Sequence, residues 1–146
     1  MRCWLKVAVL FLGMISGAAD AQSKPLSVEV LNGNNGKPAA NLHLLVFMGE
    51  SAKDIRLQKI AVDLLTDKDG MATLTLSPDK IHLLQFWPDD ETLCQASYNG
   101  TVFSVEEIMT TGTKATNTCG TLVKEAVPGH LVLFARALTL KEKMRR

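Results

Sequence analysis

The sequence is short of the residues from which catalytic and cofactor sites are usually recognised. It has three histidines, His43, His82 and His130, and none lies at the H-x-H or H-x-x-x-H spacing of a local metal-ligand pair. The nucleophile turn G-x-S-x-G and the phosphate-binding loop G-x-x-x-x-G-K-[ST] are absent. We therefore expect a protein that is not an enzyme and that carries no cofactor and no metal.

An excess of charge of one sign is also lacking. Removing Arg2, Lys6 and Asp20, which precede the mature chain proposed below, from the 16 basic and 15 acidic residues leaves 14 of each. A balanced charge gives no general attraction to nucleic acid. After residue 21, no apolar stretch approaches the roughly 20 residues that a membrane-spanning helix needs. We expect no nucleic-acid partner and no membrane span in the mature chain.

The first 21 residues have the pattern of an export signal. Arg2 and Lys6 provide a positive start, residues 7–15 are apolar, and Ala19-Asp20-Ala21 fits the A-x-A cleavage pattern. The apolar run is shorter than a membrane span, so a retained N-terminal anchor is the less favoured alternative. The prediction is a signal peptide over 1–21, cleaved after export, and a single mature domain over 22–146 that is periplasmic or secreted.

Cysteine is scarce, and its placement supports export. Cys3 lies inside the signal peptide, which leaves Cys94 and Cys119 in the mature chain. An even number of cysteines in an oxidising compartment predicts a disulfide. The separation of the two is far wider than C-x-x-C, which argues against the alternative of a redox or metal pair. The bridge would tie down a polar segment rich in Thr, Asn and Gly.

Alternation of apolar and polar residues predicts a mostly β domain. In the run MATLTL, for example, Ala72, Leu74 and Leu76 fall on one face of a strand. Gly, Pro and Asn separate the runs, which is typical of a β-sandwich. A short helix begins after the capping residue Ser104. The expected strands cover residues 26–31, 41–48, 59–66, 71–76, 81–87, 101–103 and 129–140, with residues 67–70 as the turn of a hairpin.

The first half of the mature chain resembles the carboxypeptidase regulatory-like domain. The resemblance covers residues 26–87 and is carried by Val28-Glu29-Val30, by Gly36-Lys37-Pro38 before the second strand, and by Thr66-Asp67-Lys68-Asp69-Gly70 before a further strand. It implies a transthyretin-like, immunoglobulin-like sandwich of about seven strands with one short helix. It also implies an accessory or binding role. The second half departs from the usual short module, which leaves the strand order after Trp87 open.

A sister group of transthyretin-like enzymes, the hydroxyisourate hydrolases, ends in Tyr-Arg-Gly-Ser. This chain ends in Lys-Met-Arg-Arg, so that activity is not carried over. The resemblance therefore supports a module that binds and does not catalyse.

Trp87 and the acidic residues after it form a candidate ligand surface. Trp87 and Tyr98 offer aromatic faces, and Asp89 and Asp90 offer carboxylates that accept hydrogen bonds from hydroxyl groups. A carbohydrate or cell-wall polymer fits this set. The simpler alternative is that the aromatic residues pack on the domain and that the acids form a solvated loop.

Two further alternatives concern metals. The three histidines fall in different expected strands and would meet only if those strands were neighbours with the same facing, so a small His-dependent metallo-hydrolase is kept as an alternative. Residues 67–70 begin like a calcium loop, but Gly70 follows the second Asp directly and the distal Glu is missing, which favours a turn. The leading interpretation is a non-catalytic module that binds an unknown protein or cell-surface polymer.

The export signal gives a direct test. Intact-mass spectrometry of the protein exported by its native host should show a chain that begins at Gln22, because the small residues at 19 and 21 place the cut after Ala21. An exported or membrane-bound chain that still carries residues 1–21 would contradict this prediction.

Overall fold

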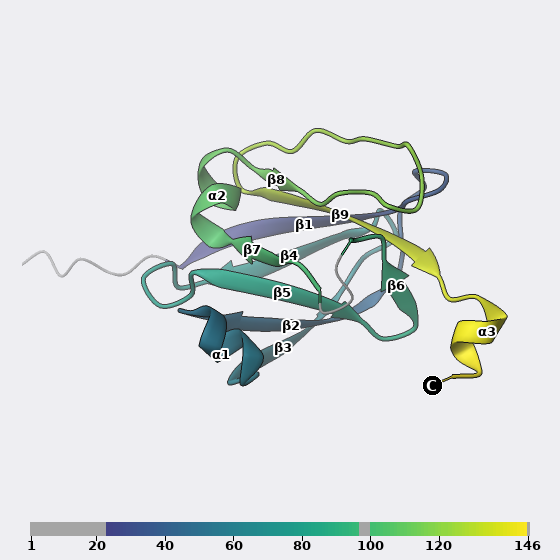
Figure 1. Ribbon diagram of the computed structural model, residues 1–146. Coiled ribbons are helices and arrows are strands. Elements are labelled where there is room, and N and C mark those ends of the chain that lie inside the picture. Colours follow the sequence, from purple (N-terminus) through teal and green to yellow (C-terminus); the bar gives the residue numbers. More distant parts are fainter. Residues whose placement is uncertain (1–22, 97–99, 146) are drawn as a thin grey trace, which may run out of the picture.

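Two β-sheets pack face to face, which confirms the predicted all-β sandwich (Figure 1). The computed structural model describes residues 23–96 and 100–145. The first sheet has the order β4 (Met71–Leu76), β1 (Lys24–Asn32), β9 (His130–Ala137) and β6 (Glu91–Leu93), with β8 (Thr113–Lys114) beside β9. The second sheet has the order β3 (Ile60–Leu65), β2 (His43–Gly49), β5 (Leu83–Pro88) and β7 (Val102–Ser104).

Three short helices occur in the described residues, where the sequence predicted one: α1 (Ala52–Arg56), α2 (Val105–Thr110) and α3 (Leu140–Lys143). The predicted helix is α2, and the Ser104 side chain caps it by accepting a hydrogen bond from the Glu107 N–H. The last strand ends at Ala137 and not at residue 140, because Thr139 caps α3. The short strands β6 and β8 lie outside the strands expected from the sequence.

The hydrophobic core lies between the two sheets. The face predicted for residues 71–76 is confirmed, since Ala72, Leu74 and Leu76 of β4 are buried. Parts of β1 and β2 are buried on both faces. Burying one large aliphatic or aromatic side chain contributes about 1.5–3 kcal/mol, so this layer supplies most of the stability. The largest side chains with almost no exposure include Phe86, Leu26, Leu44, Leu84, Ile108 and Leu131.

The turn at residues 67–70 joins the two sheets, and the prediction of a hairpin there is wrong. β3 pairs with β2, whereas β4 pairs with β1. The physical reason lies at the two ends of the turn. Thr66, with 1% of its surface exposed, is bound to the start of the second sheet. At the other end, the Val30 N–H of β1 donates to the Gly70 carbonyl at 2.8 Å.

Thr66 holds this corner with its side chain. Its Oγ1 donates to the Ala39 carbonyl at 2.6 Å and accepts from the Leu42 N–H at 2.8 Å. Gly70 adopts φ +73°, and a Cβ there would lie 2.5 Å from the Val30 carbonyl oxygen. The T-D-x-x-G pattern is therefore a corner in which the threonine hydroxyl and the absence of a side chain at Gly70 are both needed.

A strap, residues 115–128, crosses the outer face of the first sheet above β9 (Figure 1). It covers a second apolar cluster, and for this reason both faces of β9 are buried. Lys124 of the strap pairs with the largely buried Glu29 of β1 at 2.7 Å, and Asn117 Nδ2 donates to the Gly33 carbonyl at 2.8 Å. The cluster consists of Leu31, Cys94, Val132 and Phe134, packed against Cys119, Leu122 and Ala126.

The predicted disulfide is present. Cys94, directly after β6, is bonded to Cys119 of the strap, with their Cα atoms 5.3 Å apart. The Cys94 N–H also donates to the Phe134 carbonyl at 2.8 Å. The bridge thus joins the strap to the edge of the first sheet.

Replacing Thr66 tests the corner. Thr66→Val keeps the shape of the side chain but leaves a buried carbonyl and a buried N–H unsatisfied, so we expect the free energy of unfolding to fall by about 1–3 kcal/mol. Chemical denaturation measures it. Thr73→Val on the exposed side of β4 is the matched control and should change little. Equal effects of the two changes would contradict the role given to Thr66.

Removing the disulfide tests the strap. For a loop with a sequence separation of 25, the double variant Cys94→Ala with Cys119→Ala should lower the free energy of unfolding by about 3 to 4 kcal/mol. Limited proteolysis should then cut first within residues 115–128, since the sandwich core does not need the strap. Two free thiols titrated in the non-reduced, denatured wild-type protein would show that this pairing is wrong.

Candidate functional site

A groove of about 470 Å³ runs beside the disulfide. Its walls come from the end of β5, from β6, from β9, from the strap and from the loop after β1. A volume of this size is within the range of small-ligand sites in proteins. Its polar and aromatic lining includes Asn34, Trp87, Glu91, Gln95, Thr118 and Arg136.

Trp87 lines the groove at the end of β5. Leu84 and Phe86 face the core, so Trp87 faces outward, and 40% of its surface is exposed. Leu45 of β2 lies directly opposite Trp87 and fixes its place on the sheet. The lining of the groove therefore includes Trp87, which is partly open to solvent and is held in place by the pairing of β5 with β2.

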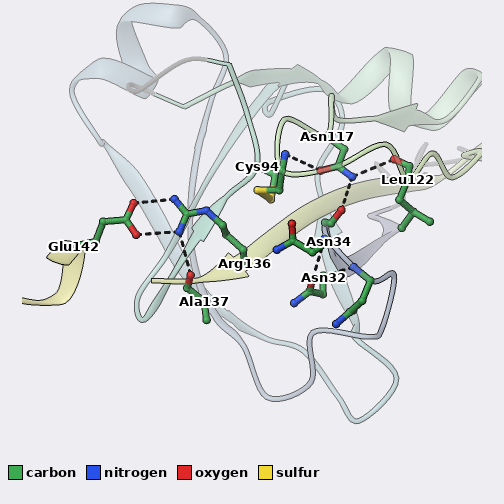
Figure 2. Close-up of a disulfide and its surroundings, with 11 residues drawn as sticks. Asn32, Asn34, Cys94, Asn117, Leu122, Arg136, Ala137 and Glu142 are labelled. Atoms are coloured by element: carbon green, nitrogen blue, oxygen red, sulfur yellow. Dashed lines mark hydrogen bonds and ion pairs between the residues drawn. A yellow bond between two sulfur atoms is a disulfide. The ribbon is translucent and has the colours of Figure 1, made fainter. Parts of the chain in front are cut away.

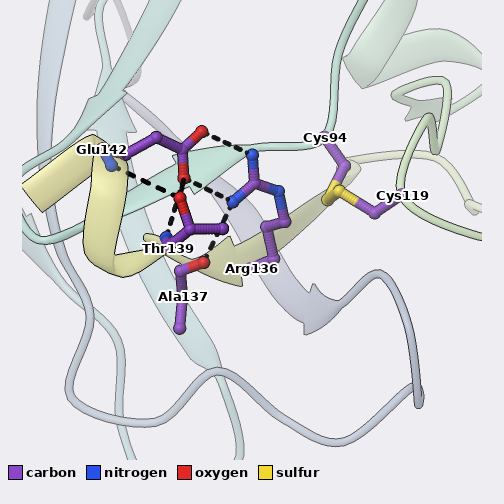
Figure 3. Close-up of polar contacts among 6 residues, drawn as sticks. All are labelled: Cys94, Cys119, Arg136, Ala137, Thr139 and Glu142. Atoms are coloured by element: carbon purple, nitrogen blue, oxygen red, sulfur yellow. Dashed lines mark hydrogen bonds and ion pairs between the residues drawn. A yellow bond between two sulfur atoms is a disulfide. The ribbon is translucent and has the colours of Figure 1, made fainter.

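Arg136 contributes the positive charge of the groove. It lies on the outer face of the first sheet, opposite Thr92 of β6. Its guanidinium group binds Glu142 at 2.9 and 2.8 Å and also donates to the Ala137 carbonyl at 3.1 Å (Figure 2). Figure 3 shows Arg136 between the disulfide and Glu142. We call the paired Arg136 and Glu142 side chains the clasp.

Glu142 is held on two sides. Besides Arg136, its Oε2 accepts from the Thr139 N–H at 2.7 Å and from the Thr139 hydroxyl at 2.8 Å (Figure 3). These bonds form the capping box of α3. The Arg136 guanidinium, together with the Thr139 bonds, holds the pKa of the Glu142 carboxyl well below its usual range, and the same pairing raises the pKa of Arg136.

Glu91 brings a second ionisable group to the groove, in a different environment. Burial raises the pKa of Glu91 above its usual value. Glu91 lies opposite Ala137 on the β6–β9 ladder, whereas Thr92 lies opposite Arg136. Since successive residues of a strand point to opposite faces, Glu91 and Arg136 are on opposite sides of this ladder. The groove keeps its acid and its cation apart.

The structure brings together only part of the ligand surface predicted from the sequence. Trp87 lines the groove, whereas Asp89 and Asp90 are exposed in the turn between β5 and β6 and are not part of its lining. Tyr98 lies outside the described residues. Arg136 was missed, and Glu91 was grouped with Asp89 and Asp90 in a solvated acidic loop, although it lines the groove. The capping pattern Thr139-Leu140-Lys141-Glu142 was readable, but nothing local in the sequence showed that Glu142 would reach Arg136.

The three histidines do not converge. His43 begins β2 and His82 precedes β5, and the antiparallel pairing of these strands sets the two histidines at opposite ends of the second sheet. His130 belongs to the first sheet, where its Nε2 lies 3.6 Å from a Glu29 oxygen. Over residues 23–96 and 100–145, no group of three or more His, Cys, Asp or Glu side chains is arranged to hold a metal ion.

Comparison with known proteins gives no relative: no family model, no curated protein and no solved structure matches this chain. In the part of the chain that the structure describes, no helix is long and apolar enough to cross a bilayer.

The clasp makes a prediction about pH. Carboxyl ¹³C NMR should show Glu142 titrating below its ordinary pKa of 4.5 and Glu91 titrating above it. A carboxyl group whose pKa is lowered by folding stabilises the folded protein at pH values above the ordinary pKa of that group. This contribution is lost as the pH falls through the lowered pKa. In Arg136→Gln the pKa of Glu142 should rise toward its ordinary value while that of Glu91 stays. If the pKa of Glu142 were the same in Arg136→Gln as in the wild-type protein, the pairing of Arg136 with Glu142 would be contradicted.

Proposed function

We propose that this protein is an exported, non-catalytic binding module, and that the groove beside the disulfide holds a carbohydrate chain. The observation that carries the proposal is the position of Trp87, which is partly exposed and lines a groove whose other walls are largely polar. The apolar face of a sugar ring packs on an aromatic side chain, and the ring hydroxyls hydrogen-bond to polar groups around it.

The polar side chains of the groove supply such partners. Asn34 and Gln95 carry amides, and Thr118 carries a hydroxyl, so hydrogen-bond donors and acceptors are both present in the lining. Burial raises the pKa of Glu91, so its carboxyl takes up a proton at a higher pH than an exposed glutamate does. A ligand rich in hydroxyl groups matches this lining better than an apolar ligand does.

Rigidity of the groove also supports binding. The Thr118 N–H donates to the Cys94 carbonyl at 3.2 Å, next to the disulfide that already joins Cys94 to Cys119. The strap residue at the rim is therefore fixed before a ligand arrives. A wall that is already ordered loses little conformational entropy on binding.

The proposed export and family membership rest on separate observations. The disulfide fits an oxidising compartment, as the signal pattern at residues 1–21 does. The corner made by Thr66 and Gly70 gives a physical reason for the T-D-x-x-G pattern shared with the carboxypeptidase regulatory-like domain. Membership of that family would agree with an accessory, binding role.

A protein partner is the second candidate, and strand β3 favours it. β3 is an edge of the second sheet, and Ile60 and Leu65 on it are 44% and 54% exposed. An exposed edge strand with apolar side chains can pair with a strand of another chain. Replacing Ile60 and Leu65 by Lys would block such pairing and leave the groove intact, which distinguishes the two candidates.

Trp87 gives the test of the carbohydrate proposal. In a chain that begins at Gln22, Trp87 is the only tryptophan, because Trp4 lies in the signal segment. We expect its fluorescence to change saturably with at least one neutral tri- to hexasaccharide from a panel built of glucose, galactose or N-acetylglucosamine. By calorimetry, Trp87→Ala should weaken that binding about tenfold, which corresponds to the loss of one aromatic contact.

The matched control is Leu57→Ala, which removes an exposed apolar side chain next to α1, away from the groove. It should leave the affinity unchanged. Binding that survives Trp87→Ala at full strength, or a panel in which no saccharide binds, would overturn the proposal.

A further inference from the structure

In the clasp, the carboxylate of Glu142 pairs with Arg136, the cation of the groove. Arg136 is the single cationic side chain among the described residues that line the groove, and Glu142 binds both ends of its planar fork. An arginine fork held by two parallel hydrogen bonds is the geometry by which proteins recognise a carboxylate. The groove thus already contains a contact between an arginine and a carboxylate, and both groups belong to this chain.

The segment that carries Glu142 is weakly attached to the rest of the domain. α3 has no buried residue, and its apolar side chains Leu140 and Met144 are each 74% exposed. Its remaining bonds, from Thr139 to Glu142, are internal to the segment. Among the described residues, Arg136 provides the side-chain contact that joins this segment to the sandwich. Moving Glu142 away from Arg136 would therefore expose little apolar surface.

We propose that Glu142 occupies the place of a ligand carboxylate, and that the groove selects an acidic saccharide whose uronate group replaces Glu142 on Arg136 while a sugar ring packs on Trp87. This inference rests on the proposed carbohydrate-binding function. It adds the class of ligand, an acidic saccharide, and names Arg136 as the residue that recognises its carboxylate. Glu142 then acts as an internal competitor that the ligand displaces.

The charge arrangement suits an acidic ligand. Glu91, the single acid of the lining within the described residues, lies on the opposite face of the β6–β9 ladder from Arg136. The carboxyl of Glu91 and the guanidinium of Arg136 thus project from opposite faces of the ladder. The remaining polar groups near Arg136, Thr92 and Thr118, are uncharged and bind hydroxyl groups without repelling an anion.

Competition by Glu142 has a measurable consequence. The apparent dissociation constant of a ligand equals the intrinsic constant divided by the fraction of time for which its site is open. If the clasp is closed about nine-tenths of the time, then removing the Glu142 carboxylate raises the affinity for a uronate about tenfold. The affinity for an uncharged saccharide should change far less, since it gains nothing from a free guanidinium group.

The test uses residues 22–146 and trimers of galacturonate, glucuronate and mannuronate, each beside its fully methyl-esterified form. Calorimetry or Trp87 fluorescence gives the affinities. We expect at least one uronate trimer to bind more tightly than its ester, Glu142→Gln to increase that preference about tenfold, and Arg136→Gln to abolish it. A chain that ends at Ala137, which lacks the whole segment, should reproduce the effect of Glu142→Gln.

The matched control is Glu125→Gln. Glu125 is also an exposed carboxylate paired with a cation, Lys114 at 2.7 Å, but it lies on the strap and does not line the groove. It should leave both affinities unchanged. An equal gain from Glu125→Gln would show a general effect of net charge and overturn the competition by Glu142.

The outcomes separate this inference from the function on which it rests. If the uronate trimers and their methyl esters bound with equal affinity, and Trp87→Ala weakened the binding of both, the inference would be overturned and the carbohydrate-binding function would stand. Binding of none of the trimers, together with failure of the neutral panel, would overturn both. A triglutamate peptide that binds as tightly as the uronates, independently of Trp87, would assign Arg136 to peptide carboxylates and would overturn the saccharide class.

Discussion

The disulfide between Cys94 and Cys119 is the constraint on which the groove depends. It meets the loop after β1 as well as the strap, since a Cβ built on Gly33 would lie 2.7 Å from Cys94 Sγ. Three segments distant in the sequence are thus held at one point. Asn34 and Thr118, which line the groove, belong to two of these segments. Arg136 of β9 lies beside the disulfide (Figures 2 and 3). Without the bridge, the strap has only polar ties and a small apolar cluster to hold it.

The sandwich beneath carries the groove on a rigid support. β1 and β9 run parallel in the middle of the first sheet. The strap covers the outer face of β9, and the inner face of β9 lies in the core between the sheets. This arrangement fixes Arg136 near the end of a central strand, while Trp87 is fixed near the end of β5 in the other sheet. The two side chains proposed to bind ligand therefore stand on different sheets, and the core between the sheets sets their separation.

The sequence predicted the features that depend on neighbours along the chain. The alternation in residues 71–76 gave the buried face of β4, Ser104 gave the start of α2, and the cysteine count gave the disulfide. Features that depend on distant pairing were missed. Residues 67–70 have the composition of a hairpin turn, and only the hydrogen bonds of Thr66 to the β1–β2 loop reveal a corner between sheets.

The candidate site follows the same division. The aromatic residue of the groove was predicted, because an aromatic side chain before Pro88 stands out in the sequence. Its charged partners were not, because Arg136 reaches the groove through the register of β6 and β9, which the local sequence does not determine. The separation of the histidines is a consequence of strand order, whereas the clasp depends on the short connection that brings α3 back to the end of β9.

The most direct test of the account is amide NMR mapping of the ¹⁵N-labelled domain with a saccharide that binds it. The account predicts chemical-shift changes concentrated at Trp87, Thr92, Thr118 and Arg136, on both sides of the disulfide. Changes concentrated instead along the free edge at residues 60–65, or at the end of the sandwich that carries α2, would contradict the claim that this groove is the binding site.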